Sequence, residues 1–171
     1  GKLLVSHVGD SGSCICTKKG PAKALIEDHK PEQPEERKRI EARGGRVEWD
    51  GYANHRVYGA NTDTPGMNMS RALGDDLGHR IAGVTYEPTI NEQILTTDDK
   101  FLCVCSDGVW EFLKPDLVAS IMDSGKTPQD ACEKVTKKAW DCWMKEEHGE
   151  VVDDITALFV KLPPLKKNAS I

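Results

Sequence analysis

The sequence lacks the features that would assign it to a membrane, nucleic-acid-binding or secreted class. No apolar stretch approaches the roughly 20 residues that a membrane-spanning helix needs. The net charge is −5, which argues against nucleic acid or an anionic lipid surface as the main partner. The first apolar run, Leu3-Leu4-Val5, is short and soon turns polar, so we expect no signal peptide.

None of the six cysteines lies at the Cys-x-x-Cys spacing that is typical of a zinc site. Cys14 and Cys16 are two residues apart, as are Cys103 and Cys105. Within a strand the members of each pair share one face, which places them poorly for a disulfide with each other. We therefore expect buried free thiols in a reducing compartment, the cytoplasm or the nucleus.

The 171 residues suffice for one domain with a core, or for a large part of a bigger domain. Residues 2–8 already read as a strand, with no cap before them, and we expect the chain to be a piece of something longer. Turn signals separate the strand-like runs 3–8, 13–17 and 22–26, and this spacing predicts an antiparallel meander.

The remaining elements follow from charge, glycine and periodicity. A charged helix is predicted at 35–43, and an irregular, glycine-rich surface segment outside the core at 46–83. The pattern then predicts strands at 89–95 and 101–105, a helix at 115–122 and a last strand at 155–162. A disordered basic tail is predicted at 163–171. Another helix begins at Thr127 as N-cap, and a stripe repeating every four residues predicts its buried face: Ala131, Val135, Ala139 and Trp143.

The apolar run from Phe101 to Cys105 stops abruptly at Ser106-Asp107-Gly108. A buried strand there would deliver one carboxylate to the end of a rigid sheet, and carboxylate oxygen is a hard ligand that suits Mg²⁺ or Mn²⁺. Asp-Gly is equally a plain turn signal. From these residues alone, the two interpretations have equal weight.

Other carboxylates also lie at strand ends. Asp10 follows the first strand, Asp153 and Asp154 precede the last, and Glu111 lies four residues after Asp107. If these ends converge, the clustered charge needs protonation, basic partners or a cation, and a divalent metal is the simplest solution. The alternative is a set of separate turn aspartates, and spacing alone favours that alternative.

Short motifs run in order along nearly the whole chain. They are Val8-Gly9-Asp10-Ser11, Asp28-His29-Lys30-Pro31 with Glu36 and Arg39-Ile40, Gly44-Gly45, Met69-Ser70-Arg71-Ala72-Leu73-Gly74-Asp75, Ser106-Asp107-Gly108-Val109-Trp110, and Asp153-Asp154-Ile155-Thr156. Each motif is weak by itself. In this order, the set resembles the metal-dependent type 2C (PPM) family of serine/threonine protein phosphatases.

The resemblance implies an α+β fold, part of an α-β-β-α sandwich in which antiparallel sheets are flanked by helices. Residues 1–162 would be the C-terminal portion of the catalytic domain, with a flap-like segment at about 31–83 that borders the active site and influences substrate choice. The implied activity of the intact enzyme is hydrolysis of phosphoserine and phosphothreonine in phosphoprotein substrates.

The resemblance also implies a metal site of two Mg²⁺ or Mn²⁺ ions, with a third in some members. The positions that match the ligands of the catalytic metal pair are Asp107 and Asp153, and Asp10 matches the third, weaker site. Asp154 replaces the usual asparagine, and this extra carboxylate could take over the ligand role from Asp153.

A motif of the family's first half, Asp-Gly-His-Gly-Gly, is missing from this chain, as is the arginine that binds the substrate phosphate. None of the histidines lies in such a setting, and for His29 we expect a structural hydrogen bond. We therefore expect the isolated chain to be inactive or nearly so, and to self-associate through exposed strand edges. The alternative function is a non-catalytic binding or regulatory module with the same fold.

Overall fold

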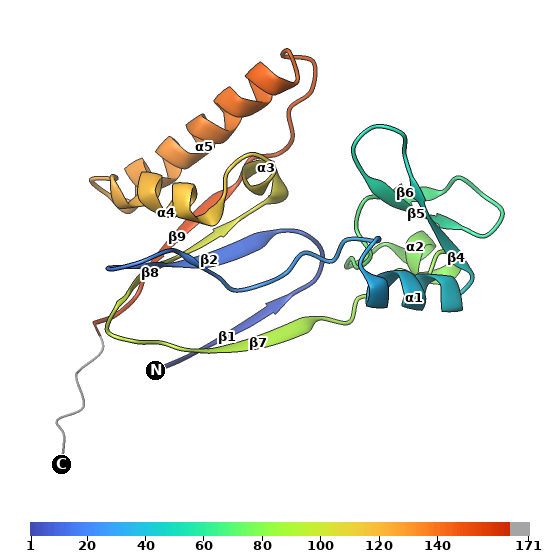
Figure 1. The fold of residues 1–171 in the computed structure, drawn as a ribbon, viewed down its shortest axis with the longest axis horizontal. Helices are drawn as coiled ribbons and strands as arrows, with labels where there is room; N and C mark the ends of the chain where they lie inside the picture. The colour runs from blue at the N-terminus through green and yellow to red at the C-terminus, as the bar shows by residue number, and fades with distance from the viewer. Residues whose placement is uncertain (165–171) are drawn as a thin grey trace. The chain divides into compact units, whose positions relative to one another are not determined.

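The computed structural model describes residues 1–164, so most of the tail predicted at 163–171 lies outside the described residues. The chain divides into two compact units (Figure 1). Unit 1 contains Gly1–Val5, Ser11–Glu27 and the chain from Asn91 onward, and unit 2 contains Ser6–Asp10 and Asp28–Ile90. Among residues 1–164, no helix combines the length and the apolarity needed to cross a membrane.

Unit 1 is built on a four-stranded antiparallel sheet of order β3-β2-β8-β9. Its strands are β2 (Gly12–Thr17), β3 (Lys23–Ala24), β8 (Asp99–Cys105) and β9 (Ala157–Lys161). Helices α3 (Asp107–Trp110), α4 (Pro115–Asp123) and α5 (Pro128–Glu146) cover one face of this sheet (Figure 1). The predicted mixture of helices and antiparallel sheet is confirmed.

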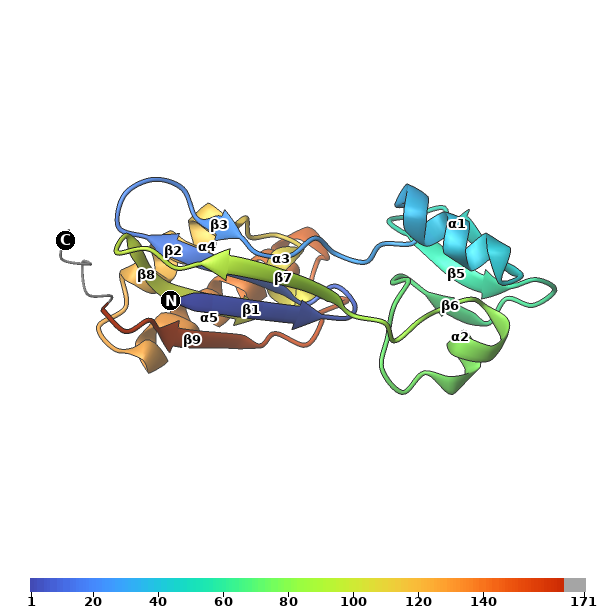
Figure 2. The same cartoon turned by 90° about the horizontal axis from the view of Figure 1, so that it is seen from below.

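A second, two-stranded sheet pairs β1 (Lys2–His7) with β7 (Thr89–Ile94). The parts of these strands that belong to unit 1 lie against the face of β2 and β8 that the helices do not cover (Figure 2). Ile15 of β2 is fully buried there. Unit 1 therefore has one helical layer and two layers of strands.

The strongest sequence patterns form the core of unit 1. Alternate residues of β8, namely Phe101, Cys103 and Cys105, are buried. In α5 the Thr127 Oγ1 accepts the Asp130 N–H at 3.1 Å, which confirms the predicted N-cap. The predicted stripe is buried at its first three positions, Ala131, Val135 and Ala139, and half-buried at Trp143.

The cysteines of β2 and β8 are buried free thiols, as predicted. Cys14 lies directly opposite Cys103 in the ladder, and both are fully buried. Burial raises the pKa of Cys105 to about 12, so this thiol stays protonated at neutral pH. The residues act here as small apolar core side chains.

Unit 2 contains a small layer of its own, although the sequence predicted an irregular surface segment at 46–83. Its elements are α1 (Pro34–Ala42), β4 (Gly45–Trp49), β5 (His55–Gly59), β6 (Pro65–Met67) and α2 (Asp76–Ile81), and the three strands form an antiparallel sheet of order β4-β5-β6. A compact apolar cluster holds them together: Ile40, Val47, Val57, Ala82 and Val84. The prediction failed because β4 and β5 each have a single buried apolar residue, Val47 or Val57, which is too sparse to produce a periodic signal.

The predicted meander of the first three strands is also wrong, since β1 pairs with β7 and only β2 and β3 are neighbours. The link after β1 is held by a distant segment: the Gly9 N–H donates to His29 Nδ1 at 3.1 Å, and the His29 N–H donates to the Gly9 carbonyl at 3.0 Å. These bonds replace the local ones that a hairpin turn would make.

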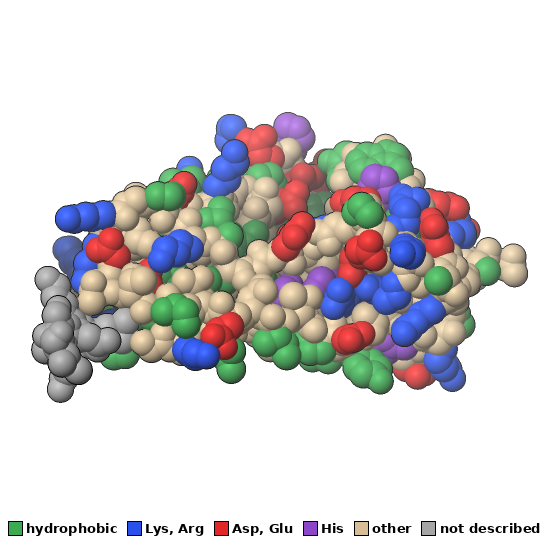
Figure 3. Space-filling model, turned by 60° about the horizontal axis from the view of Figure 1, so that its bottom comes forward, with side chains coloured by type: hydrophobic (Ala, Val, Ile, Leu, Met, Phe, Trp, Pro, Cys, Tyr) green, Lys and Arg blue, Asp and Glu red, His purple; other side chains and the backbone are tan. Residues whose placement is uncertain are grey.

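Acidic and basic side chains are interspersed on the face shown in Figure 3 rather than gathered by sign. This distribution agrees with the modest net charge of −5.

Candidate metal site

The topology brings two of the predicted carboxylate motifs to one edge of the sheet. Strands β8 and β9 are antiparallel, and Cys105 at the end of β8 lies opposite Ala157 at the start of β9. The chain that leaves β8 and the chain that enters β9 therefore meet at this edge. Asp107 lies on the first of these segments, and Asp153 and Asp154 lie on the second.

Ser106 joins the two segments. Its N–H donates to the Thr156 carbonyl at 3.1 Å, and its Oγ donates to the Asp154 carbonyl at 2.8 Å. The same Oγ accepts the Thr156 N–H at 3.0 Å. A Cβ on Gly108 would lie 2.5 Å from the Asp154 carbonyl oxygen, so this close approach requires glycine. The backbone positions of the two segments are thus fixed to one another.

The carboxylates themselves are held by local hydrogen bonds. Asp107, half-buried at the first position of α3, accepts the Gly108 N–H through Oδ1 at 3.0 Å. Asp153 is exposed and accepts the Asp154 N–H through Oδ1 at 2.7 Å. Each carboxylate is therefore oriented by the amide of the next residue.

Two indole side chains brace the loop after β8. The Trp143 Nε1–H donates to the Gly108 carbonyl at 2.7 Å, and the Trp110 Nε1–H donates to the Cys105 carbonyl at 2.9 Å. A Cβ on Gly12 would lie 2.4 Å from Trp110 Nε1, so the indole packs directly on β2. Sequence reasoning assigned Trp143 to the apolar stripe and missed these two hydrogen bonds, as it missed those of Ser106.

The carboxylates of the second segment line a hollow of about 600 Å³ beside α5. Its other walls come from α5, where the Trp140 side chain is exposed, and from Ile155. Solvent and ligands can reach this edge of the sheet.

The donor chemistry of this edge fits a hard divalent cation, because carboxylate oxygens are the ligands that Mg²⁺ and Mn²⁺ prefer. The number of donors is smaller than a complete site needs. Among residues 1–164, no three His, Cys, Asp or Glu side chains lie together in an arrangement that could hold a metal ion. The chain contributes a partial donor set, and the ligand roles of Asp107, Asp153 and Asp154 stay predictions.

Asp10 and Glu111 have other surroundings. Asp10 belongs to unit 2, is 5% exposed, and accepts a hydrogen bond from Lys30 Nζ at 2.5 Å. Glu111 is exposed directly after α3, and its N–H donates to the Asp107 carbonyl at 2.9 Å. The third-site role of Asp10 stays a prediction, and Lys30 is its charge partner in this structure.

His29 makes the structural hydrogen bonds that were predicted for it. Because its Nδ1 accepts the Gly9 N–H, its Nε2 carries the proton and donates to Thr89 Oγ1 at 2.8 Å. Its ring stacks on His7 with centroids 4.2 Å apart. Burial, with the positive charge of Arg71, lowers the pKa of His29 to about 4, so the ring is neutral at physiological pH.

A buried ionic cluster lies nearby in unit 2. Glu36 accepts hydrogen bonds from Arg71 Nη2 at 2.6 Å and from Ser70 Oγ, and it pairs with Arg39 Nη1 at 2.8 Å. Burial by itself would raise the pKa of Glu36, but the hydrogen bonds from Arg71, Ser70 and Arg39 outweigh it and hold this pKa at about 2. The motifs around these residues therefore meet to stabilise unit 2.

Comparison with known proteins gives consistent matches. A family model described as Protein phosphatase 2C matches residues 1–146. Probable protein phosphatase 2C 52 of Oryza sativa subsp. japonica is 39% identical over 159 residues, covering 93% of this chain and 29% of that protein. Probable protein phosphatase 2C 72 of Arabidopsis thaliana is 36% identical over 167 residues, covering 91% of this chain and 49% of that protein. The chain spans about half or less of the length of such relatives.

Solved structures share the fold. The serine-threonine phosphatase 2C from Toxoplasma gondii superposes with a TM-score of 0.82 at 21% identity, covering 94% of this chain and 54% of that chain. A C. elegans sex determining protein superposes with a TM-score of 0.76 at 19% identity, covering 95% of this chain and 37% of that chain. At these identities the likeness establishes the fold.

Proposed function

Because the chain belongs to the protein phosphatase 2C family, we propose that, within a protein of its relatives' length, it takes part in the metal-dependent hydrolysis of phosphoserine and phosphothreonine in phosphoproteins. The observation that carries this proposal is the junction at Ser106, whose hydrogen bonds hold the segment of Asp107 against the segment of Asp153. A scaffold without catalysis has no need of two carboxylate-bearing segments fixed to one another at a sheet edge.

In this proposal Asp107 and Asp153 hold the catalytic pair of Mg²⁺ or Mn²⁺ ions, with Asp154 as the alternative to Asp153 and Asp10 as the ligand of a third ion. When bound, such ions lower the pKa of a coordinated water and offset the charge that develops on the phosphoryl oxygens. The chain's own contribution is positional. Ser106 fixes the spacing of the two segments, and Trp143 fixes the backbone at Gly108.

The segment at about 31–83, which lies within unit 2, is proposed as the flap that borders the site and influences the choice of phosphoprotein. Its support is that this segment belongs to one compact unit, with Ser6–Asp10, and exposes large side chains, with Tyr52 79% and Leu73 76% exposed. Exposed aromatic and apolar side chains are the kind that contact a protein partner.

Activity of a protein of the relatives' length tests the metal ligands. With Mn²⁺ and p-nitrophenyl phosphate as substrate, Asp107→Asn and Asp153→Asn are each expected to lower the rate by about 100-fold or more, since each removes a ligand charge. Asp98→Asn, at an exposed turn of unit 1, is the matched control and is expected to leave the rate unchanged. A normal rate in Asp153→Asn together with a severe loss in Asp154→Asn would assign the ligand to Asp154.

The isolated 171-residue chain is expected to show little or no turnover in the same assay, because its donor set is partial among the described residues. A rate near that of the longer protein would contradict this. The alternative function is a non-catalytic binding or regulatory module, and the same partial set of metal donors favours it. This alternative predicts that the longer protein is inactive with Mn²⁺ and that Asp107→Asn changes nothing.

Self-association of the isolated chain is proposed through β9. Within the described residues β9 pairs only with β8, and it exposes Leu158 by 54% and Val160 by 37%. An exposed, apolar edge strand favours pairing with a second copy. Sedimentation should show a dimer or larger species that Leu158→Lys converts to monomer, and a monomeric parent chain would contradict the proposal.

A cytoplasmic or nuclear location completes the proposal, and its support is the set of free, buried cysteines. One rice relative, 38% identical over 82% of this chain, has a name that includes the word mitochondrial. Imaging of the tagged protein tests the location, and recovery in mitochondria would contradict it.

A further inference from the structure

A second pocket of unit 1 lies at the opposite end of the sheet from Asp107 and Asp153. The register pairs Phe101, near the start of β8, with Lys161, at the end of β9, whereas Cys105 and Ala157 are paired at the metal-site edge. The pocket lies at the Phe101 end, against the turn that joins α4 to α5, and its volume is about 360 Å³. It therefore shares no residue with the proposed metal site.

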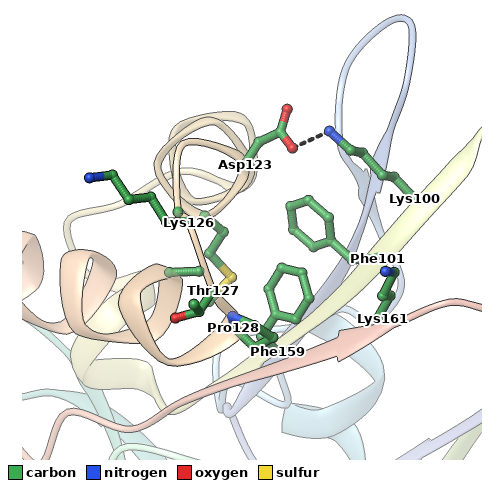
Figure 4. Close-up of a pocket in the computed structure, with 11 residues that line it drawn as sticks. Lys100, Phe101, Asp123, Lys126, Thr127, Pro128, Phe159 and Lys161 are labelled. Carbon is green, nitrogen blue, oxygen red and sulfur yellow. Dashed lines mark hydrogen bonds and ion pairs between the residues drawn. The ribbon is translucent and has the colours of Figure 1, made fainter.

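The inner part of this pocket is apolar, and charged side chains lie around it. The rings of Phe101 and Phe159 stack with centroids 4.5 Å apart and planes inclined by 27° (Figure 4). Phe101 is only 2% exposed, so the half-buried Phe159 ring, backed by Phe101, is the aromatic surface that a ligand can contact. Thr127 and Pro128, at the start of α5, lie across from the rings, and Met122 also lines the pocket. A volume in the lower part of the roughly 300–1,000 Å³ range of small-molecule sites suits a ligand of one or two fused rings.

The turn that closes the pocket is rigid. A Cβ on Gly125 would lie 2.7 Å from the Cα of Ala131, so the turn packs tightly on the first residues of α5. The Lys126 N–H donates to Asp130 Oδ2 at 2.7 Å, and the Asp130 N–H donates to Thr127 Oγ1 at 3.1 Å. The pocket is thus formed before any ligand binds, which lowers the entropic cost of binding.

The rim of the pocket is cationic. Lys100 is neutralised by an ion pair with Asp123. The ammonium groups of Lys126 and Lys161 make no ion pair within residues 1–164, and both side chains are exposed. The start of α5 adds little further positive charge, because the Asp130 carboxylate lies in its first turn, where it is paired with Lys134. In a chain of net charge −5, this local excess of positive charge favours an anion.

From the aromatic wall and the cationic rim, we propose that this pocket binds a small aromatic carboxylate. The flat ring system inserts between the Phe159 ring and Pro128, and the carboxylate lies at the rim. The side chains of Lys126 and Lys161 are flexible, so their ammonium groups can reach the carboxylate there.

Titration of the isotope-labelled 171-residue chain with naphthoate, followed by NMR, tests the proposal, with naphthylmethanol as the neutral ring of matched size. Naphthoate is expected to saturate in the millimolar range or tighter. It should shift the signals of residues 100–101, 125–128 and 159–161. Naphthylmethanol should shift the same signals with about fivefold weaker affinity, the effect of two exposed charge contacts.

The double variant Lys126→Gln/Lys161→Gln should reduce the affinity for naphthoate to that for naphthylmethanol and leave naphthylmethanol unaffected. Lys38→Gln, an exposed lysine of α1, is the control and should change neither. Each of the following results would overturn the proposal: no saturable shift with naphthoate, shifts confined to other residues, equal affinity for the two compounds, or unchanged naphthoate affinity in the double variant. An amide spectrum of the double variant that is unchanged away from the pocket would show that its fold is intact.

Discussion

The two units of this chain reach stability by different means. Unit 1 has a continuous apolar core under α4 and α5, which includes four buried cysteines and the stripe of α5. Unit 2 has an apolar cluster of only five buried residues. It adds a buried ionic cluster around Glu36 and a neutral, hydrogen-bonded His29.

The difference indicates how each unit should respond to mutation and pH. Apolar packing is insensitive to pH and is lost gradually as volume is removed. A buried charge network is stable only while it is complete, because one missing partner leaves an uncompensated charge. We therefore expect unit 2 to be the unit that fails on charge removal and acidification.

The largest effect is expected for Glu36→Gln. This change leaves Arg39 and Arg71 without their shared carboxylate and should lower the free energy of unfolding of unit 2 by about 3–5 kcal/mol. Hydrogen exchange of the β4 and β5 amides should speed up far more than that of the β8 and α5 amides. Glu41→Gln, at an exposed position on the same helix, is the control, with an effect below about 0.5 kcal/mol. Equal acceleration of amide exchange in both units would show that they unfold together, and it would contradict the difference in how the two units are stabilised.

Leu113→Ala is the matching experiment on unit 1. Leu113 is 1% exposed in the apolar core, and its truncation should cost about 3 kcal/mol through lost burial and a new cavity. The β8 and α5 amides should now exchange faster, whereas β4 and β5 stay protected. Leu117→Ala, 43% exposed on α4, should cost less than about 1 kcal/mol. Similar losses of unfolding free energy for Leu113→Ala and Leu117→Ala would show that the apolar core is not the source of the stability of unit 1.

Acidification should destabilise unit 2 through His29. The folded-state pKa is lowered from 6.5 to about 4, so between these values the unfolded chain binds a proton that the folded ring does not. The stability is fully present above pH 6.5 and should fall by up to about 3 kcal/mol as the pH drops toward 4. Denaturant titrations at several pH values in this window, together with hydrogen exchange of unit 2, measure this loss of stability. A His29→Asn chain with the same pH dependence would assign the effect to another group.

The smallest effect is expected at the start of α5. Thr127→Ala removes the oxygen that accepts the Asp130 N–H, which should cost about 1 kcal/mol and loosen only the first turn of α5. Ser120→Ala, an exposed helical position in α4, is the control and should be close to neutral. Thermal melts and exchange rates at the start of α5 give the answer, and a loss below that of the control would mean that Asp130 alone caps the helix.

Unit 1 was largely predictable and unit 2 was not. Phe101, Cys103 and Cys105 alternate along β8 and are followed at once by a turn, so a buried strand could be inferred from local pattern. In β4 and β5, Val47 and Val57 stand alone among polar neighbours, and their burial depends on Ile40 and Val84, which are distant in sequence. Local periodicity contains no such information.

The candidate site shows the same limit. The places of Asp107 and Asp153 at the ends of strands could be predicted, because strand ends follow from the pattern. The bond of Ser106 to Asp154 spans 48 residues, and that of Trp143 to Gly108 spans 35. Only the pairing of β8 with β9 and the packing of α5 create these contacts.

The central claim is that the Asp107 and Asp153 segments together contribute to one metal site. Titration of the labelled chain with Mn²⁺, a paramagnetic ion, tests it without any need for activity. Signals of residues 107–108 and 153–155 should broaden together at the lowest Mn²⁺ concentrations, and Mg²⁺ should reverse the effect. Asp107→Asn should weaken the broadening at both segments, whereas Asp98→Asn should not. Two results would contradict a shared site. One is broadening at other residues, and the other is broadening of residues 153–155 that is unchanged in Asp107→Asn.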